Sequence, residues 1–247
     1  MAPVISSRDN EKLKLARKLH ERRWRDKLGL FLCEGEDLVA AALDAGLAPV
    51  ETLVDAERPA LVERLSRADP VEPALLAEIS TLGHPPRVLA VFRYADLPRL
   101  DQSAPPAVGL ALWRVGDPGN VGTLLRALDA LGPGFLALSP GCADPTGPKA
   151  LRAAAGATFR VPTCGFDEAP GRRVALVARG GTPLAEVEPA EITTYVLGAE
   201  REGLPEDVLS RCEVLATIPQ SGPAESLNVA MAGTVALYEL ARRFSAS

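Results

Sequence analysis

The stretch that decides the fold is VGLALWRVGDPGNVGTLLRALDAL, residues 108–131. Its apolar run Val108–Val115 predicts a buried strand, and Val121–Leu131 has apolar residues at helical spacing. Glycines 116 and 119 lie between them and Gly122 lies in the first turn of the helix, where the free N–H groups of a helix start favour anions. They do not form the G-x-G-x-x-G fingerprint of dinucleotide-binding folds, and Asp-Pro-Gly-Asn alone is typical of a β-turn. The stretch therefore predicts one strand–loop–helix unit of an α/β sheet.

Strands and helices alternate on both sides of this unit. After it we expect strands at 135–138, 174–178 and 195–197 and helices at 148–155 and 227–244; before it, strands at 30–33, 50–54 and 88–92 and helices at 9–27, 37–45 and 59–66. This order predicts an α/β fold with a mostly parallel sheet covered on both faces. The proline-rich stretch 98–107 predicts a linker between a domain of residues 1–97 and a domain of residues 108–247.

Charge is distributed unevenly along the 247 residues, whose net charge is −5. Residues 1–30 hold nine lysines and arginines against four aspartates and glutamates. Leu13, Leu15, Leu19 and Trp24 lie among them as a loose helical stripe. The segment is thus either the solvated face of a basic amphipathic helix or a surface that attracts a polyanion.

Several classes of protein are disfavoured by the sequence. No run of eighteen apolar residues predicts a membrane span, and the start has no signal-peptide pattern, so we expect a cytoplasmic location. Cys33, Cys142, Cys164 and Cys212 form no C-x-x-C pair, and the chain has only two histidines. We expect reduced thiols and no metal site.

Two further loops carry polar residues where strands end or helices begin. GAEREGLP, residues 198–205, follows a predicted strand and holds Glu200. IPQSGPAESLNVA, residues 218–230, enters the last helix, with Ser226 well placed as its N-cap. Taken alone, the first is either a charged surface turn or a glycine-flanked carboxylate that can approach a ligand closely, and the second is a capped helix start. Asn228 is unexplained by a cap, because an apolar residue is expected inside the first turn of this helix.

Taken together in this order, the three loops resemble the motifs of the SpoU-type RNA ribose methyltransferases of the SPOUT superfamily. The family's catalytic residues correspond to Asn120, Arg126, Glu200, Ser226 and Asn228. SPGCADPTGPKALRAAAGATFRVP, residues 139–162, resembles a further family segment, although Ala154 stands where many members have serine. The resemblance is strong over residues 108–244. It is looser before the linker, where the chain resembles a small α/β, ribosomal-protein-like substrate-binding domain.

This resemblance implies S-adenosylmethionine as methyl donor, a trefoil knot in the second domain and a homodimer whose active sites are lined by both subunits. The cofactor is expected against Gly198, Ile218 and Leu227. RNA is expected to bind a set of basic side chains: Arg8, Arg17, Arg22, Arg23, Lys149 and Arg152. A guanidinium stays protonated, so we expect Arg126 to clamp phosphate and hydroxyl, and the group that takes the hydroxyl proton stays open.

The substrate and two rival functions also stay open at this point. The separate first domain favours large-subunit ribosomal RNA over transfer RNA, and the methylation would be either housekeeping or antibiotic resistance. One rival is an RNA-binding paralogue without activity, and the other is a small-molecule or nucleotide-dependent α/β enzyme. The five motif residues disfavour the first rival, and the missing dinucleotide and phosphate fingerprints disfavour the second.

Overall fold

The computed structural model describes residues 3–65, 67–222 and 226–244. These residues form two compact units. The first unit extends to Leu97 and also includes Thr146–Phe159, and the second holds Pro98–Pro145 and the chain from Arg160 onward. The chain therefore leaves the first unit beside the proline-rich stretch 98–107 and returns to it once.

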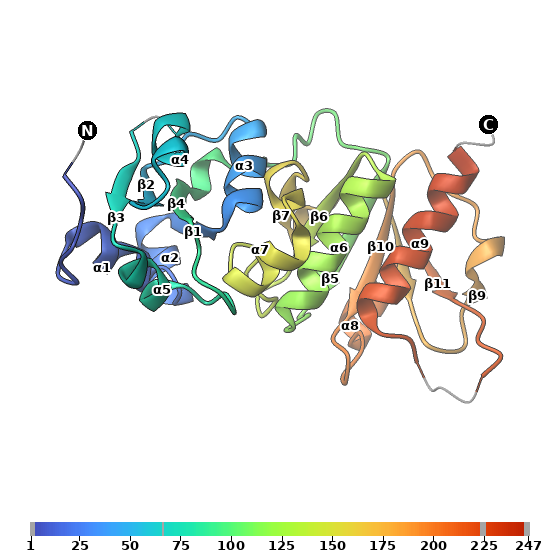
Figure 1. The fold of residues 1–247 in the computed structure, drawn as a ribbon. Coiled ribbons are helices and arrows are strands. Elements are labelled where there is room, and N and C mark those ends of the chain that lie inside the picture. Colours follow the sequence, from blue (N-terminus) through green and yellow to red (C-terminus); the bar gives the residue numbers. More distant parts are fainter. Residues whose placement is uncertain (1–2, 66, 223–225, 245–247) are drawn as a thin grey trace. The chain divides into compact units, whose positions relative to one another are not determined.

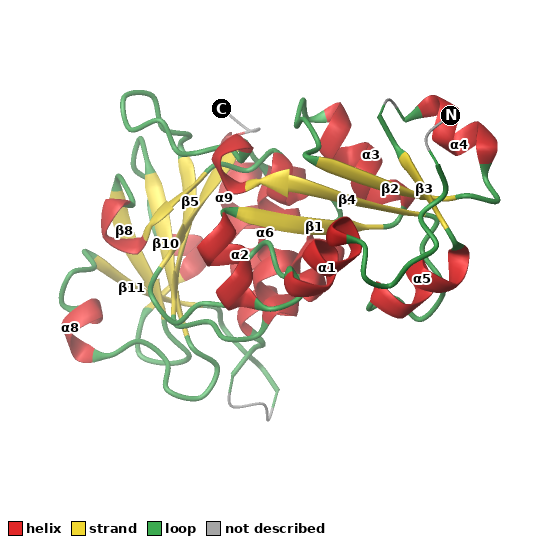
Figure 2. Cartoon of the chain, turned by 90° about the vertical axis from the view of Figure 1, so that its left-hand side faces the viewer, coloured by secondary structure: helices red, strands yellow, loops and turns green. Residues whose placement is uncertain are grey.

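The first unit is built around a four-stranded sheet in the order β1-β4-β2-β3 (Figure 2). β4 is antiparallel to both β1 and β2, while β2 and β3 are parallel. The strands are β1 (Leu30–Glu34), β2 (Glu51–Asp55), β3 (Asp69–Val71) and β4 (Val88–Arg93). The helices are α1 (Glu11–Lys18), α2 (Arg22–Leu28), α3 (Glu36–Asp44), α4 (Pro59–Arg64), α5 (Pro73–Ile79) and α7 (Pro148–Ala154), with short 3₁₀ turns at Tyr94–Asp96 and Ala157–Phe159.

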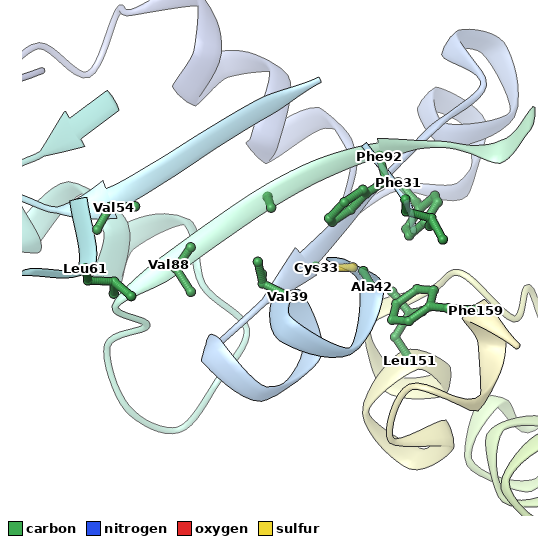
Figure 3. Packing of buried hydrophobic residues seen from close by; sticks show 12 residues of the cluster. Phe31, Cys33, Val39, Ala42, Val54, Leu61, Val88, Phe92, Leu151 and Phe159 are labelled. Carbon is green, nitrogen blue, oxygen red and sulfur yellow. The ribbon is translucent and has the colours of Figure 1, made fainter. Parts of the chain in front are cut away.

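Apolar residues cover both faces of this sheet, because successive strand residues point to opposite faces. Phe31 packs toward α3, α4 and α7, whereas Leu32 packs toward α1 and α5. Figure 3 shows Phe31 with Phe92 and Phe159, and its ring centroid lies 5.8 Å from that of Phe92 and 6.2 Å from that of Phe159. The segment Thr146–Phe159 thus completes the core of the first unit.

The single helix expected over residues 9–27 is wrong. The structure has α1 and α2, which are separated by Leu19, His20 and Glu21. The buried Arg25 side chain donates hydrogen bonds to the carbonyl oxygens of Leu19 (2.9 Å) and His20 (2.8 Å). These bonds satisfy carbonyl groups that a helix end leaves without an intrahelical partner, and so stabilise the break.

The second unit is a seven-stranded sheet in the order β7-β6-β5-β10-β8-β11-β9, and every neighbouring pair is parallel. The strands are β5 (Val108–Trp113), β6 (Gly134–Leu138), β7 (Thr163–Gly165), β8 (Arg172–Leu176), β9 (Thr182–Pro183), β10 (Thr193–Gly198) and β11 (Val214–Thr217). The helices are α6 (Pro118–Leu131), α8 (Glu206–Leu209) and α9 (Val229–Phe244), with 3₁₀ turns at Phe166–Glu168 and Leu184–Glu186.

Helices α6 and α9 lie side by side over this sheet (Figure 1). Gly233 allows their close approach, because a Cβ atom there would lie 2.4 Å from Leu124 Cδ2 of α6 and 3.3 Å from Leu197 Cδ2 of β10. The contact places the amino-terminal ends of both helices near the loop that follows β10.

The expected α/β class with a mostly parallel sheet is confirmed. Strand β3, helix α5 and the short elements β7, α8, β9 and β11 were not predicted from the sequence. Among the described residues, no helix is both long and apolar enough to cross a membrane.

Candidate active site

The carboxyl ends of parallel strands meet at one edge of a sheet, which is where α/β proteins bind ligands. At this edge of the second unit lies a pocket of about 640 Å³, a size typical of small-molecule sites. It is formed by the end of β8, the loop after β10 and the two segments on either side of residues 223–225. Gly198, Ile218 and Leu227, which the sequence analysis assigned to the cofactor, all line it.

A chain of hydrogen bonds joins the three predicted loops beside this pocket. Asn120 Nδ2, at the start of α6, donates to Glu200 Oε1 in the loop after β10 at 2.6 Å. Asn228 Nδ2, at the start of α9, donates to Asn120 Oδ1 at 3.2 Å. Glu200 and Asn228 also line the pocket. Three residues from distant parts of the sequence therefore form one exposed polar cluster.

Helix caps explain how two of these loops are held. Asp117 accepts a hydrogen bond from the Asn120 backbone N–H at 3.0 Å and Pro118 begins α6, so Asp-Pro is a helix start and not only a turn. Asn228 Oδ1 accepts from the backbone N–H groups of Ala230 (2.9 Å) and Met231 (3.3 Å). The expectation that Ser226 caps the last helix is therefore wrong. Ser226 is exposed and lines the pocket, while Pro223–Glu225 lie outside the described residues.

Arg126 does not line the pocket. It lies on α6 six residues after Asn120, about 9 Å farther along the helix axis, and its side chain is exposed. Within residues 3–65, 67–222 and 226–244 it makes no hydrogen bond or ion pair. The structure thus brings together four of the five predicted catalytic residues and leaves the fifth on the helix surface.

The predicted RNA-binding residues all belong to the first unit. Arg8 pairs with Glu78, Arg22 with Asp26 at 3.6 Å, and Arg23 with Glu21 at 2.7 Å. Arg17 donates to the Arg8 carbonyl oxygen at 2.8 Å. On α7, Lys149 and Arg152 are exposed, and Arg152 donates to Thr81 Oγ1 at 2.9 Å and lines a second pocket of about 740 Å³. Several cations of this set therefore have carboxylate partners already.

The first unit also contains a buried polar cluster that was not predicted from the sequence. Glu34 accepts hydrogen bonds from Ser80 Oγ (2.8 Å), Thr81 N–H (2.8 Å) and Thr81 Oγ1 (2.7 Å). His20 Nε2 donates to the Ile79 carbonyl oxygen at 2.7 Å, and its Nδ1 lies 3.9 Å from Glu34 Oε1. The available signal was a carboxylate at the end of an otherwise apolar strand.

The four cysteines are free thiols, and Cys33 and Cys142 are buried. Burial raises the pKa of the Cys33 thiol well above its usual value, and the neighbouring Glu34 carboxylate adds to the shift. Burial also raises the pKa of Cys164, to about 11. Both thiols are therefore poor nucleophiles at neutral pH. The described residues contain no group of three or more His, Cys, Asp or Glu side chains arranged to hold a metal ion.

Residues 107–238 match the model of the SpoU rRNA Methylase family, and residues 10–90 match that of the MRM3-like substrate binding domain. The chain is 32% identical to the 23S rRNA (guanosine(2553)-2'-O)-methyltransferase RlmP of Bacillus subtilis, over 96% of this chain and 98% of that protein. It is 31% identical to the 23S rRNA (uridine(2479)-2'-O)-methyltransferase of Streptomyces viridochromogenes, over 91% of this chain and 87% of that protein.

A solved structure supports the same assignment. The AdoMet-bound rRNA methyltransferase from Sinorhizobium meliloti superposes with a TM-score of 0.85 at 28% identity and covers 98% of both chains. The family match spans more than half of the sequence and includes all three loops of the polar cluster. The chain therefore belongs to the SpoU rRNA methylase family.

Proposed function

We propose that the protein transfers a methyl group from S-adenosylmethionine to a ribose 2′-hydroxyl of large-subunit ribosomal RNA. The observation that carries the proposal is the Glu200–Asn120–Asn228 hydrogen-bond chain at the pocket, because it joins the three motifs that define the family resemblance. Both named 2'-O-methyltransferases to which the chain is similar act on 23S rRNA, one at a guanosine and the other at a uridine.

The lining of the pocket fits the chemistry of this cofactor. Leu176, Leu197 and Ile218 offer an apolar wall to a purine ring and a thioether. Glu200 and Glu202 offer negative charge to a sulfonium and an ammonium group. When bound, S-adenosylmethionine supplies a methyl group on positively charged sulfur, which becomes a neutral thioether after transfer. Gly198, Ile218 and Leu227 are the residues we expect to hold it.

Catalysis then depends on orienting the attacking ribose oxygen. Glu200 and Asn120 fix each other through their hydrogen bond, and Asn228 fixes Asn120 from the other side. Ser226 lies on the cofactor side, next to Leu227. Arg126 grips the adjacent phosphate and the hydroxyl through its planar fork of N–H donors. With the cofactor bound, these residues would orient the ribose hydroxyl, and the cofactor would supply the methyl group that this oxygen receives.

In a homodimer, Arg126 can act on a pocket that it does not line in its own subunit. Met231, Val235 and Tyr238 form one exposed stripe on α9, with 63%, 40% and 59% of their surface accessible. Such a stripe is suited to docking a second copy of the chain. α6, which carries Arg126, lies beside α9 (Figure 1), so a copy docked on the stripe would lie next to the helix that carries this arginine. We infer that Arg126 of one subunit serves the pocket of the other.

Mixed dimers test this arrangement. One subunit carries Arg126→Ala, and the other carries Glu200→Ala in its pocket. If Arg126 acts on the partner's pocket, the mixed dimer regains one intact site and about half of the wild-type activity per dimer. If it acts within its own subunit, the mixed dimer stays as inactive as its parents. Light scattering that gives the monomer mass of 26.0 kDa at micromolar concentration contradicts the homodimer itself.

Arg126 variants and a modified substrate test the chemistry. Arg126→Ala should leave folding and S-adenosylmethionine binding nearly intact and lower single-turnover methylation by about a hundredfold. Lysine should rescue poorly, because a point charge lacks the planar fork. RNA with a 2′-deoxy target nucleotide should not be methylated. Near-wild-type rates for Arg126→Ala, or methylation of the deoxy substrate, contradict this mechanism.

The first unit supplies the substrate specificity in this proposal. Residues 10–90 match a substrate-binding domain, so we assign RNA docking to residues 1–97 together with the segment Thr146–Phe159 of the same unit, and catalysis to the remainder of residues 108–247. The docking set is Arg8, Arg17, Arg22, Arg23, Lys149 and Arg152. We propose a cytoplasmic location, because ribosomal RNA is the substrate. Mapping ribose methylation in cells with and without the gene identifies the RNA, and transfer RNA as the only changed species contradicts the ribosomal assignment.

A further inference from the structure

Three cationic groups surround the indole of Trp24 in the first unit. Lys18 Nζ lies 5.1 Å from the ring centroid, Arg23 Cζ lies 5.6 Å away and Lys27 Nζ lies 5.2 Å away. Lys18 ends α1, whereas the other residues belong to α2. We call these four residues the Trp24 cluster. A ring within such distances of several cations is attracted to them through its negative face.

The indole does not serve to dock α2 on the core. The buried side chain of α2 is Arg25, while Trp24 is partly exposed and Leu28 is 41% exposed. Of the two apolar clusters described for the first unit, neither includes Trp24. The ring is therefore part of the surface that surrounding solvent and ligands meet.

Two cations of the cluster are available to an anionic ligand. Arg23 already pairs with Glu21, at 2.7 Å. Lys18 and Lys27 are both exposed, and across the described ranges no carboxylate lies within ion-pairing distance of either ammonium. The surface thus combines a flat aromatic face with two unneutralised positive charges.

We propose that the Trp24 cluster binds one unpaired nucleotide of the RNA substrate, with its base stacked on the indole and its flanking phosphates held by Lys18 and Lys27. This inference rests on the proposed RNA substrate. A base stacked on an aromatic side chain is held more strongly than an ammonium over an exposed ring. The base therefore displaces an ammonium from the indole, and the ammonium pairs with a phosphate. Bases inside a duplex are already stacked and paired, so the cluster selects single-stranded segments.

The indole itself reports the binding. The chain has two tryptophans, and Trp113 lies on β5 of the second unit, so Trp113→Phe leaves Trp24 as the only indole. This full-length variant is titrated with a single-stranded RNA of about a dozen nucleotides and with the same sequence as a duplex. We expect the single strand to quench Trp24 fluorescence and the duplex to leave it nearly unchanged. Equal quenching by both overturns the proposal.

Affinities measured on the two RNAs separate stacking from charge. Trp24→Ala should weaken single-strand binding about tenfold and duplex binding less than about twofold, with Trp24→Phe in between. Replacing both Lys18 and Lys27 with glutamine should reduce the slope of log affinity against log salt by about 1.4. Lys14→Gln is the matched control, because its ammonium already lies 3.1 Å from Glu11. It should leave the slope unchanged.

The outcomes distinguish this inference from the proposed function. A wild-type protein that binds neither RNA and methylates none contradicts the proposed function, and this inference with it. If the wild type binds and methylates RNA, but Trp24→Ala and Trp24→Phe bind the single strand with the same affinity as the wild type, this inference alone is contradicted. Urea unfolding of each variant confirms that the fold is retained, and the phenylalanine variant keeps the test decisive if alanine disturbs α2.

Discussion

Glu34 ends β1 in the first unit and Glu200 follows β10 in the second, yet their carboxylates have opposite environments. The Glu34 side chain is 3% exposed and accepts three hydrogen bonds from Ser80 and Thr81. Glu200 is exposed, borders a pocket and receives one hydrogen bond from Asn120. A buried carboxylate with several donors holds the segment that carries those donors in place, whereas an exposed one with spare lone pairs can act on a ligand. The same residue type thus serves stability in one unit and function in the other.

The largest expected effect concerns Glu34. Glu34→Ala leaves two hydroxyl groups and the Thr81 N–H without their acceptor, so we expect a loss of about 3 kcal/mol in the free energy of unfolding. Urea unfolding measures it. Glu36→Ala is the control, because the Glu36 carboxylate forms partly exposed ion pairs with Arg87 (3.2 Å) and Arg64 (3.7 Å) and should contribute at most about 1 kcal/mol. Equal losses in the two variants contradict a special role for the buried carboxylate.

Glu200 should give the reverse result. Glu200→Ala removes the acceptor that orients Asn120 Nδ2, and we expect single-turnover methylation to fall about a hundredfold. The free energy of unfolding should change by less than about 0.5 kcal/mol, since the side chain is exposed. Glu200→Gln keeps an oxygen that accepts this bond, so it separates orientation from charge. A destabilisation as large as that of Glu34→Ala removes the contrast between the two glutamates.

The sequence predicted Glu200 but not Glu34 for a physical reason. Glu200 stands in a glycine-flanked loop after a predicted strand, a position where the sheet edge meets ligands. Glu34 is explained by its partners Ser80 and Thr81, which lie more than forty residues away. No local pattern shows that these residues meet, because the contact depends on how β1 and the segment after α5 pack.

Similar limits apply elsewhere in the chain. Strands β1, β4 and β5 were predictable, because apolar runs of four or more residues mark them. The division between α1 and α2 was not, since it depends on Arg25 folding back to the carbonyl groups of Leu19 and His20. Ser226 and Asn228 are equally good N-caps by local preference, but Asn228 also binds Asn120 across the sheet edge, a contact that the local sequence does not show. The trefoil knot implied by the family resemblance stays a prediction.

Asp117 is a third carboxylate, intermediate between the two glutamates. It caps α6 by accepting from the Asn120 N–H at 3.0 Å, so it supports the fold and holds a residue of the polar cluster. Asp117→Ala should lower the free energy of unfolding by about 1 kcal/mol, and Asp117→Asn, another good cap, should nearly restore it. If alanine instead lowers methylation and leaves urea unfolding unchanged, the carboxylate acts on a ligand as Glu200 does and is not chiefly a cap.

The smallest expected effect concerns Asp69. Its ion pair with Lys12 is neither buried nor directed at a ligand. Lys12 Nζ lies 2.5 Å from Asp69 Oδ2 and 2.8 Å from Glu51 Oε2, and hydrogen bonds to Asp69 and then Glu51 raise the pKa of Lys12 above 10.5. A raised pKa for a cationic group means that its stabilisation is complete below the unfolded value and is lost as pH rises through the folded value. Because the Lys12 side chain is 36% exposed, solvent screens the pair and limits its contribution to under about 1 kcal/mol.

The difference in the free energy of unfolding between wild type and Lys12→Met should therefore be small at about pH 9 and should shrink further above about pH 11. A difference that grows with pH contradicts the predicted direction of the pH dependence. A difference above about 3 kcal/mol would be as large as that expected for Glu34, and burial would then not be the property that separates these carboxylates.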